Sequence, residues 1–412
     1  MRRFNYIILL LIFSTAAYAQ MSLNDYLKIA AEENPMLKAK FKMYMAALEK
    51  VNQTGSLPDP TLTFGYFISP VETRVGAQKF RLAIAQMFPW MGTLKARERA
   101  SASLAKVQFE AFQEAKSELF YQVQTKWLAI YVLRRELSIM SANLEILRTF
   151  EPVTKTKYEA NLVSLADLIR VQINIENAET ELEIAKMKEG VLISDFNTSI
   201  NRSPESPVIT APFSVLINED VSSEDSLFNQ PRIKAIKANI QSMTDAEVLA
   251  DLRRKPNIGF GLEYGFVSKR SGVTLSDNGK DILLPTVSMS LPIFGKKNRS
   301  FKKEAVLKRE SFEAELVSVK NDLKNEWNSV AFEKTSAEKQ LEKFQSEIEK
   351  VEVLLNVLTS EYSNNNRDFE TLLSTQQRLL QLQLAQINAQ AQLQKTAFKK
   401  GYLTSQTLNQ IR

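Results

Sequence analysis

The chain has 412 residues, with 53 Lys and Arg against 47 Asp and Glu, and it contains neither cysteine nor histidine. Without these two residue types it cannot form disulfides, thiolate or imidazole metal sites, or the commonest general base. Its charges are spread along helical stretches and do not gather around aromatic residues, which argues against nucleic-acid binding. No carboxylate pairs with a nucleophile, so we expect neither an enzyme nor a bound cofactor or metal.

Residues 1–19 have the pattern of a secretory signal peptide. Arg2 and Arg3 precede an apolar run that ends at a small-residue cleavage site, Ala17-Tyr18-Ala19. Cleavage is expected before Gln20, and because no cysteine follows, the exported chain is not expected to carry a lipid. A membrane anchor is the less favoured alternative. No later segment reaches the ~18 uninterrupted apolar residues of a transmembrane helix, so an inner-membrane protein is not expected.

The first half of the exported chain, residues 20–200, is expected to open with two helices separated at Asn34-Pro35. A β-hairpin follows at about residues 60–89, with a turn expected through Pro70 and Gly76. The side chains expected on one face of its first strand are Leu62, Phe64, Tyr66 and Ile68. Long helices are then expected over about residues 94–200, because this range contains few Gly and Pro.

The second half, residues 230–400, follows a connector at residues 201–229. Its hairpin, at about residues 256–292, alternates more sharply. Apolar positions Ile258, Phe260, Leu262, Tyr264 and Phe266 oppose Gly259, Gly261, Glu263 and Gly265. Long helices are expected over about residues 295–400, and residues 401–412 form a polar tail.

The two halves match as an internal repeat. The segment after Asn34-Pro35 resembles the one after Gln230-Pro231, and the same spacing carries Pro60 onto Pro256. Beyond the hairpins, Gly92 matches Gly295. We infer a duplicated helix-strand-strand-helix-helix unit, and hence a mainly α chain with a pair of β-hairpins.

A hairpin with one apolar face is typical of a membrane β-barrel, and the number of strands in this chain is too small to close such a barrel alone. Two hairpins supply four strands, whereas the smallest single-chain membrane barrels have about eight. Three copies would pool twelve strands and remove every open edge. The helix after Gly295 carries a narrow apolar seam suited to packing against other helices. This seam comprises Leu316, Val319, Leu323, Val330, Ala337, Leu341, Phe344, Ile348, Val351 and Leu355.

Three segments carry a family resemblance. They read L-P-D-P-x-L at Leu57 to Leu62, Q-M-F-P-W-M-G-T-L-K-A-R at Gln86 to Arg97, and Y-x5-S-x2-D-L-I-x2-Q at Tyr158 to Gln172. The chain thereby resembles the TolC-like outer-membrane efflux channel family. The resemblance implies a homotrimer with a twelve-stranded β-barrel in the outer membrane of a Gram-negative bacterium and a long α-helical barrel in the periplasm.

The resemblance also implies a function and partners. Such channels are the passive exit ducts of tripartite pumps, joined to a periplasmic adaptor (membrane fusion) protein and an inner-membrane transporter, here expected to be of the resistance-nodulation-division type. The cargo would be drugs, metal ions or other small molecules. Two alternatives stay open: an outer-membrane channel for type I protein secretion, and a periplasmic coiled-coil adaptor without a barrel.

By resemblance, the periplasmic gate would involve Arg367, Tyr362 and Asp167. An Arg–carboxylate pair can be broken by competing contacts without unfolding a core. Its alternative is an ordinary exposed ion pair. Thr371 and Ser374 stand where some members have an acidic ring, and Asp368 or Glu370 would have to supply that negative charge.

Two further groups of residues are candidates. Asn161, Asn364, Asn365 and Asn366 suit the turns at the helical tips, either as adaptor-docking residues or through turn geometry alone. Trp90, Lys296, Lys297 and Arg299 are expected at the membrane interface, in contact with outer-membrane lipid. For the basic residues, a solvated helix surface is the equal alternative.

Overall fold

The computed structural model describes residues 21–210, 224–272, 274–364 and 369–406. The expected signal peptide therefore lies outside the described residues, as do parts of the expected connector and tail. The chain divides into two compact units. Unit 1 comprises residues 1–39, 113–231 and 320–412, and unit 2 comprises residues 40–112 and 232–319.

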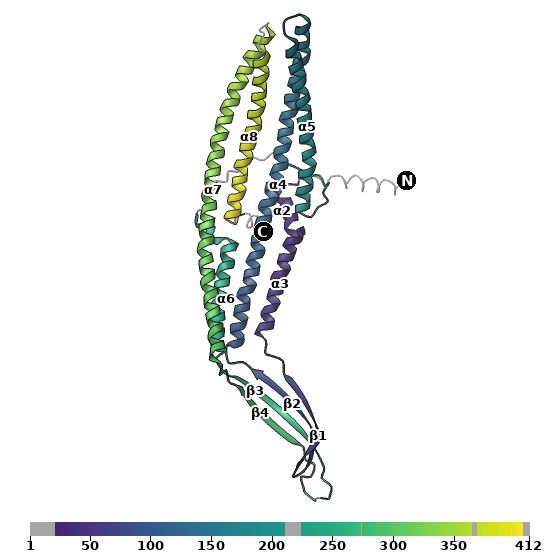
Figure 1. Cartoon of the computed structure of the whole chain (residues 1–412), viewed down its shortest axis with the longest axis vertical. Helices are drawn as coiled ribbons and strands as arrows, with labels where there is room; N and C mark the ends of the chain where they lie inside the picture. The colour runs from purple at the N-terminus through teal and green to yellow at the C-terminus, as the bar shows by residue number, and fades with distance from the viewer. Residues whose placement is uncertain (1–20, 211–223, 273, 365–368, 407–412) are drawn as a thin grey trace, which may run out of the picture. The chain divides into compact units, whose positions relative to one another are not determined.

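Helices dominate the chain, and the strands form one small antiparallel sheet, as the sequence predicts. The elements are α2 (Leu23–Glu33), α3 (Pro35–Gly55), β1 (Thr61–Thr73), β2 (Gly76–Phe88), α4 (Thr93–Glu159), α5 (Leu165–Ser199), η2 (Glu224–Asn229), α6 (Pro231–Leu252), β3 (Asn257–Ser268), β4 (Ile282–Ser290), α7 (Gly295–Ser363) and α8 (Phe369–Leu403) (Figure 1). None of the helices in the described ranges has the length and apolar character that a membrane span requires.

The sheet of unit 2 has the order β1-β2-β3-β4 (Figure 1). Its register aligns apolar residues across the strands, with Leu62 opposite Ile84 and Ile84 opposite Leu262. Phe80 and Phe266 stack on the same face with ring centroids 4.9 Å apart. Because side chains alternate across a pleated sheet, one face is a continuous apolar surface, and the other is mainly small or polar, with Ile282 and Leu284 of β4 as apolar exceptions.

The polar face carries an ion pair between neighbouring strands. Arg81 Nη1 of β2 lies 3.4 Å from Glu263 Oε1 of β3. The glycines of β3 make room on this face, since a Cβ at Gly261 would lie 2.7 Å from Thr286 Oγ1. The polar face therefore combines small residues with a cross-strand pair of opposite charges.

The expected turn through Pro70 is wrong, because β1 continues through Pro70 to Thr73 and β2 begins at Gly76. The β1–β2 register shifts between Tyr66 and Val71, and proline is tolerated at such an irregularity on an outer strand. Gly76 has φ +129°, and a Cβ there would collide with the Ser268 carbonyl oxygen. The turn is therefore shorter than expected and lies between Thr73 and Gly76.

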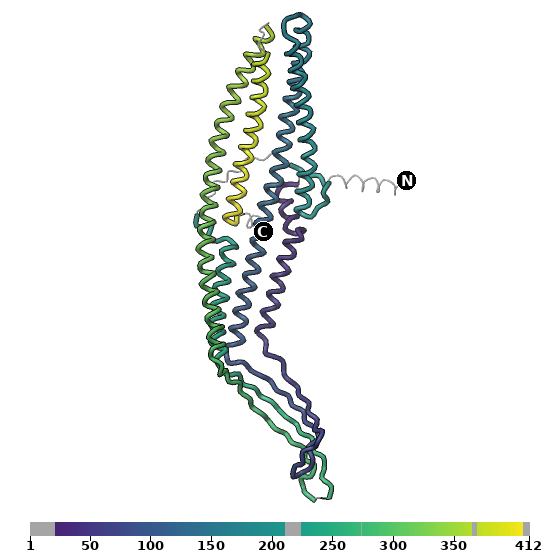
Figure 2. The backbone as a smooth tube through the Cα atoms, viewed as in Figure 1, coloured from purple at the N-terminus to yellow at the C-terminus, as the bar shows by residue number. Residues whose placement is uncertain are grey.

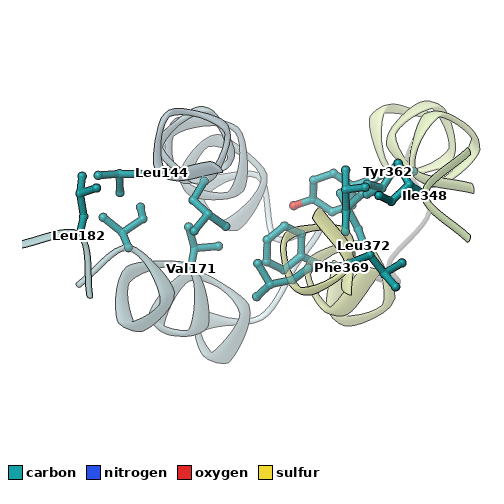
Figure 3. Close-up of a cluster of buried hydrophobic side chains, with 13 residues drawn as sticks. Leu144, Val171, Leu182, Ile348, Tyr362, Phe369 and Leu372 are labelled. Carbon is teal, nitrogen blue, oxygen red and sulfur yellow. The ribbon is translucent and has the colours of Figure 1, made fainter. Parts of the chain in front are cut away.

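In unit 1, the later part of α4 and α5 form one helical hairpin, and the later part of α7 and α8 form a second (Figure 2). Side chains of all four helices meet in one buried cluster (Figure 3). The part of the α7 seam that lies in unit 1 is confirmed. Its buried members are Leu323, Val330, Ala337, Ile348 and Leu355.

The connector is held in unit 1 by hydrogen bonds to the backbone of residues 208 and 209. The Trp127 indole donates to the carbonyl oxygen of Ile209 at 3.1 Å, and Arg134 Nη1 donates to that of Val208 at 2.8 Å. The Ile209 amide donates to the Tyr26 hydroxyl at 2.9 Å. Side chains of α2 and α4 thus satisfy backbone groups that have no strand partner.

Candidate functional site

The turn between α4 and α5 is held by local hydrogen bonds. Asn161 has φ +57°, a left-handed conformation that Asn adopts more readily than most residues. Ser164 caps α5: the Asp167 amide donates to Ser164 Oγ at 3.2 Å, and the Ser164 amide donates to Asp167 Oδ2 at 3.0 Å. This capping box satisfies amides that the first turn of a helix leaves open.

Arg170 connects this turn to α8. Its Nη1 lies 3.5 Å from Asp167 Oδ1 and 2.9 Å from Glu370 Oε2. Two of the expected gate residues, Asp167 and Glu370, are therefore joined by an arginine that was not among the sequence candidates. The sequence does offer one indication of this role, because Arg170 follows Asp167 by three residues and so lies on the same helix face.

Tyr362 lies in the buried cluster near the end of α7, with a 4% exposed side chain. Its hydroxyl is 3.3 Å from Thr154 Oγ1 of α4, and its ring centroid is 5.0 Å from that of Phe369. The Lys157 amine donates to the Tyr362 carbonyl oxygen and lies 3.9 Å from the ring centroid. Figure 3 shows Tyr362 beside Phe369 and Leu372. One lysine thus binds both an end carbonyl of α7 and an aromatic face.

Burial raises the pKa of the Tyr362 phenol above its ordinary value. The hydrogen bond with Thr154 lowers this pKa, and the negative charge of Asp167 raises it. The phenol is therefore neutral near neutral pH and interacts as a hydrogen-bonding group.

The remaining tip candidates divide between described and undescribed positions. The Asn364 amide donates to the Ser360 and Glu361 carbonyl oxygens, both at 3.1 Å, and closes the end of α7. Four expected site residues lie outside the described residues: Asn365, Asn366, Arg367 and Asp368. The expected pairing of Arg367 with Asp167 stays a prediction.

Polar contacts continue between the two hairpins beyond the tips. Gln376 of α8 donates to Asn143 Oδ1 of α4 at 2.9 Å in a buried position, and Gln377 donates to Asn174 of α5. A buried amide pair is costly to separate unless each group finds another partner. These contacts therefore favour one register of α8 against the first hairpin.

The expected membrane-interface residues lie in unit 2 beside the sheet. Trp90, in the connection from β2 to α4, is 38% exposed, and Lys296, Lys297 and Arg299 are exposed on the first turns of α7. Within the described ranges, no group of His, Cys, Asp or Glu is arranged to hold a metal ion. The candidate sites are thus the turns at the ends of the helical hairpins in unit 1 and, in unit 2, the base of the sheet, which is the end where α6 leads into β3 and β4 leads into α7.

Neither a protein-family model nor a curated protein matches the chain. Several solved structures match the chain over most of its length. The outer membrane protein VceC from Vibrio cholerae has a TM-score of 0.75 and 16% identity, over 93% of this chain and 95% of that one. CusC has a TM-score of 0.80 and 12% identity, over 93% and 91%. The open state of the MtrE outer membrane channel from Neisseria gonorrhoeae has a TM-score of 0.70 and 15% identity, over 91% and 88%.

At these identities the likeness is one of fold, and it extends over nearly the whole of each chain. It agrees with the resemblance carried by the three sequence motifs. The chain therefore has the fold of the TolC-like outer-membrane efflux channels.

Proposed function

We propose that this chain is the outer-membrane exit duct of a tripartite efflux pump. Three copies form a passive channel that carries drugs, metal ions or other small molecules to the exterior. An inner-membrane transporter of the resistance-nodulation-division type and a periplasmic adaptor deliver the cargo, and the protein itself performs no chemistry.

The observation that carries this proposal is the sheet of unit 2. Its apolar face lacks a covering element among the described residues: Leu62, Phe64 and Tyr66 are 68%, 67% and 69% exposed. Its outer strands, β1 and β4, pair with no further described strand. An apolar face is stable against lipid, but open edges are not, because their amides find no water there. Pairing β1 of one copy with β4 of the next supports a closed barrel of twelve strands.

The helices support the second part of the proposal. In α7 the residues on the seam are buried or partly buried, whereas other apolar residues such as Phe332 and Val353 are 73% and 64% exposed in the single chain. Exposed apolar residues on a helix outside lipid favour packing against further helices. Helices of three copies would thus continue the barrel as an α-helical duct across the periplasm.

We assign the gate to the tips of unit 1. Tyr362, Asp167 and Glu370 belong to it, with Arg367 and Asp368 as further members, and Arg170 joins two of them. Asn161, Asn364, Asn365 and Asn366 are the proposed adaptor-docking residues. The exposed ion pair of Arg170 and Glu370 supports this assignment, because an adaptor can replace it with its own contacts.

Reconstitution and fractionation test the proposal. The purified protein should migrate as a trimer in mild electrophoresis, stay in the membrane after carbonate washing and conduct ions across planar bilayers. Release by carbonate without a trimer would contradict the proposal and favour a periplasmic coiled-coil adaptor.

Deletion of the gene tests the cargo. Sensitivity to a panel of toxicants should increase while the exported proteome stays unchanged. Loss of one secreted protein with normal resistance would instead assign the channel to type I secretion.

A further inference from the structure

A basic groove lies at the base of the sheet, between the end of α6 and the start of α7. It has a volume of about 310 Å³ and is lined by Arg254, Asn298, Arg299, Lys302, Lys303 and Val306. All of these residues belong to unit 2. Arg254 comes from the turn after α6, so two separate segments of the chain build the groove.

The groove has an excess of positive charge. Residues 251–255 and 295–304 contain eight Lys and Arg but only two carboxylates, Asp251 and Glu304. Asp251 binds Lys302 at 2.7 Å, and Glu304 binds Lys308 at 2.7 Å.

Three cations of the groove remain available to a ligand. Over the described part of the chain, no carboxylate lies within ion-pair distance of Arg254, Arg299 or Lys303. Like charges gathered around a concave surface repel one another and attract an anion. The arginines can also donate two parallel hydrogen bonds to a phosphate.

Exposed apolar residues directly precede the two groove segments or follow them in the sequence, and they indicate what kind of anion the groove takes. The segment from β4 into α7 exposes Leu291 at 67%, Ile293 at 76% and Phe294 at 77%. Arg254 lies three residues before β3, whose apolar face is exposed. A free phosphate would use only the cations, whereas an anionic phospholipid would also cover the apolar side chains.

We propose that this groove binds the phosphate of an anionic phospholipid, with the acyl chains lying against the apolar face of the sheet. This proposal rests on the proposed function, since it places the base of the sheet at the level of the lipid headgroups. Lys303 and Arg299 of α7 and Arg254 after α6 hold the phosphate. Lys302 stays bound to Asp251 and shapes the wall of the groove.

The test is a lipid titration of the full-length protein in detergent, followed by native mass spectrometry. The probes are dioleoylphosphatidylglycerol and, as the zwitterionic comparison, dioleoylphosphatidylcholine. The groove variant is Arg254→Gln with Lys303→Gln. The matched control is Lys42→Gln with Lys50→Gln, which removes two exposed cations from α3 in the same unit.

The wild type should bind phosphatidylglycerol more tightly than phosphatidylcholine. The groove variant should lose about fivefold in phosphatidylglycerol affinity for each cation removed, while the control variant binds as the wild type does. Equal phosphatidylglycerol binding by the groove variant and the wild type would overturn the proposal. Inorganic phosphate that binds the wild type as tightly as phosphatidylglycerol does would assign the groove to free phosphate and overturn the lipid assignment.

A conductance measurement separates this proposal from the proposed function. The groove variant should still form channels in planar bilayers, since its substitutions leave the strands unchanged. A wild type that binds phosphatidylglycerol but never conducts would contradict the channel and leave the lipid site standing.

Discussion

Arg170 of α5 and Glu370 of α8 form an ion pair of 2.9 Å that joins the ends of the two helical hairpins. Both side chains are substantially exposed, at 48% and 71%. Such a pair contributes under about 1 kcal/mol to stability, because water and salt screen it and two long side chains must be ordered. It can therefore break and reform without unfolding the tips, as a gate contact requires.

Replacing Arg170 with Ser should raise single-channel conductance in planar bilayers while leaving thermal unfolding nearly unchanged. Arg148→Ser is the matched control, because Arg148 pairs with Glu145 and Glu179 inside the first hairpin. The charge-swapped pair Arg170→Glu with Glu370→Arg should restore the low conductance. Unchanged conductance in Arg170→Ser would remove this ion pair from the gate.

Much of the fold could be predicted because its signals are local. Alternation at Phe260 and Leu262 has the period of a strand, and the apolar seam of α7 has the spacing of a packed helix. The sequence predicts a turn at Pro70 because proline usually ends a strand. What admits it inside β1 is a register shift against β2, which is a relation between two strands.

The candidate site was less predictable for the same physical reason. The partner of Glu370 is Arg170, and the residue that binds the Tyr362 carbonyl is Lys157. Both contacts join helices that are distant in the sequence, so they depend on how the hairpins pack. Asp167 is predicted to pair with Arg367, which lies outside the described residues, and its described contacts are those with the cap residue Ser164 and with Arg170.

Lys157 should stabilise the end of α7 through its two contacts with Tyr362. Lys157→Met keeps the length of the side chain but removes the charge, the hydrogen bond and the cation–π contact. We expect a loss of about 1–2 kcal/mol. The measurement is thermal unfolding in detergent, with Lys155→Met as the control for an exposed neighbouring lysine. Equal losses in both variants would show that the contact with Tyr362 is not stabilising.

Alkaline pH should destabilise the protein partly through Tyr402. Its hydroxyl donates to Glu114 Oε1 at 2.6 Å, and burial, followed by this bond and nearby carboxylates, raises the pKa of the phenol. A raised pKa in the folded state means that the folded chain keeps a proton which the unfolded chain releases above about pH 10. The stabilisation is therefore complete below that pH and is lost as the pH rises further.

Tyr402→Phe should consequently reduce the loss of thermal stability between about pH 8 and about pH 11. Near neutral pH the variant should be less stable by about 1 kcal/mol, because it lacks the hydrogen bond to Glu114. Glu114→Gln should weaken the alkaline effect in part, since it keeps an acceptor but removes a charge. An identical alkaline loss in wild type and Tyr402→Phe would show that other groups cause it.

Variants of Asn161 distinguish a role of this residue in the turn from a role in adaptor docking. Its φ of +57° is easy for glycine but costs a β-branched residue about 1–2 kcal/mol. Asn161→Gly should thus retain the wild-type melting temperature, and Asn161→Val should lower it. If the side chain also docks the adaptor, Asn161→Gly should weaken adaptor capture in pull-down assays. Full capture by this variant would leave Asn161 with a role in the turn alone.

The pair of Arg81 and Glu263 should tune the ion selectivity of the proposed pore, because both side chains lie on the polar face of the sheet. Glu263→Gln leaves Arg81 without its carboxylate and should raise the ratio of chloride to potassium permeability by about twofold or more at low salt. Arg81→Gln should lower this ratio. The charge swap Arg81→Glu with Glu263→Arg keeps the net charge and should stay close to the wild type. Reversal potentials in a salt gradient measure the effect, which should fade near 1 M salt, where charges are screened within about 3 Å. An ion selectivity that is the same in the wild type and in all three variants would mean that the polar face does not line the pore.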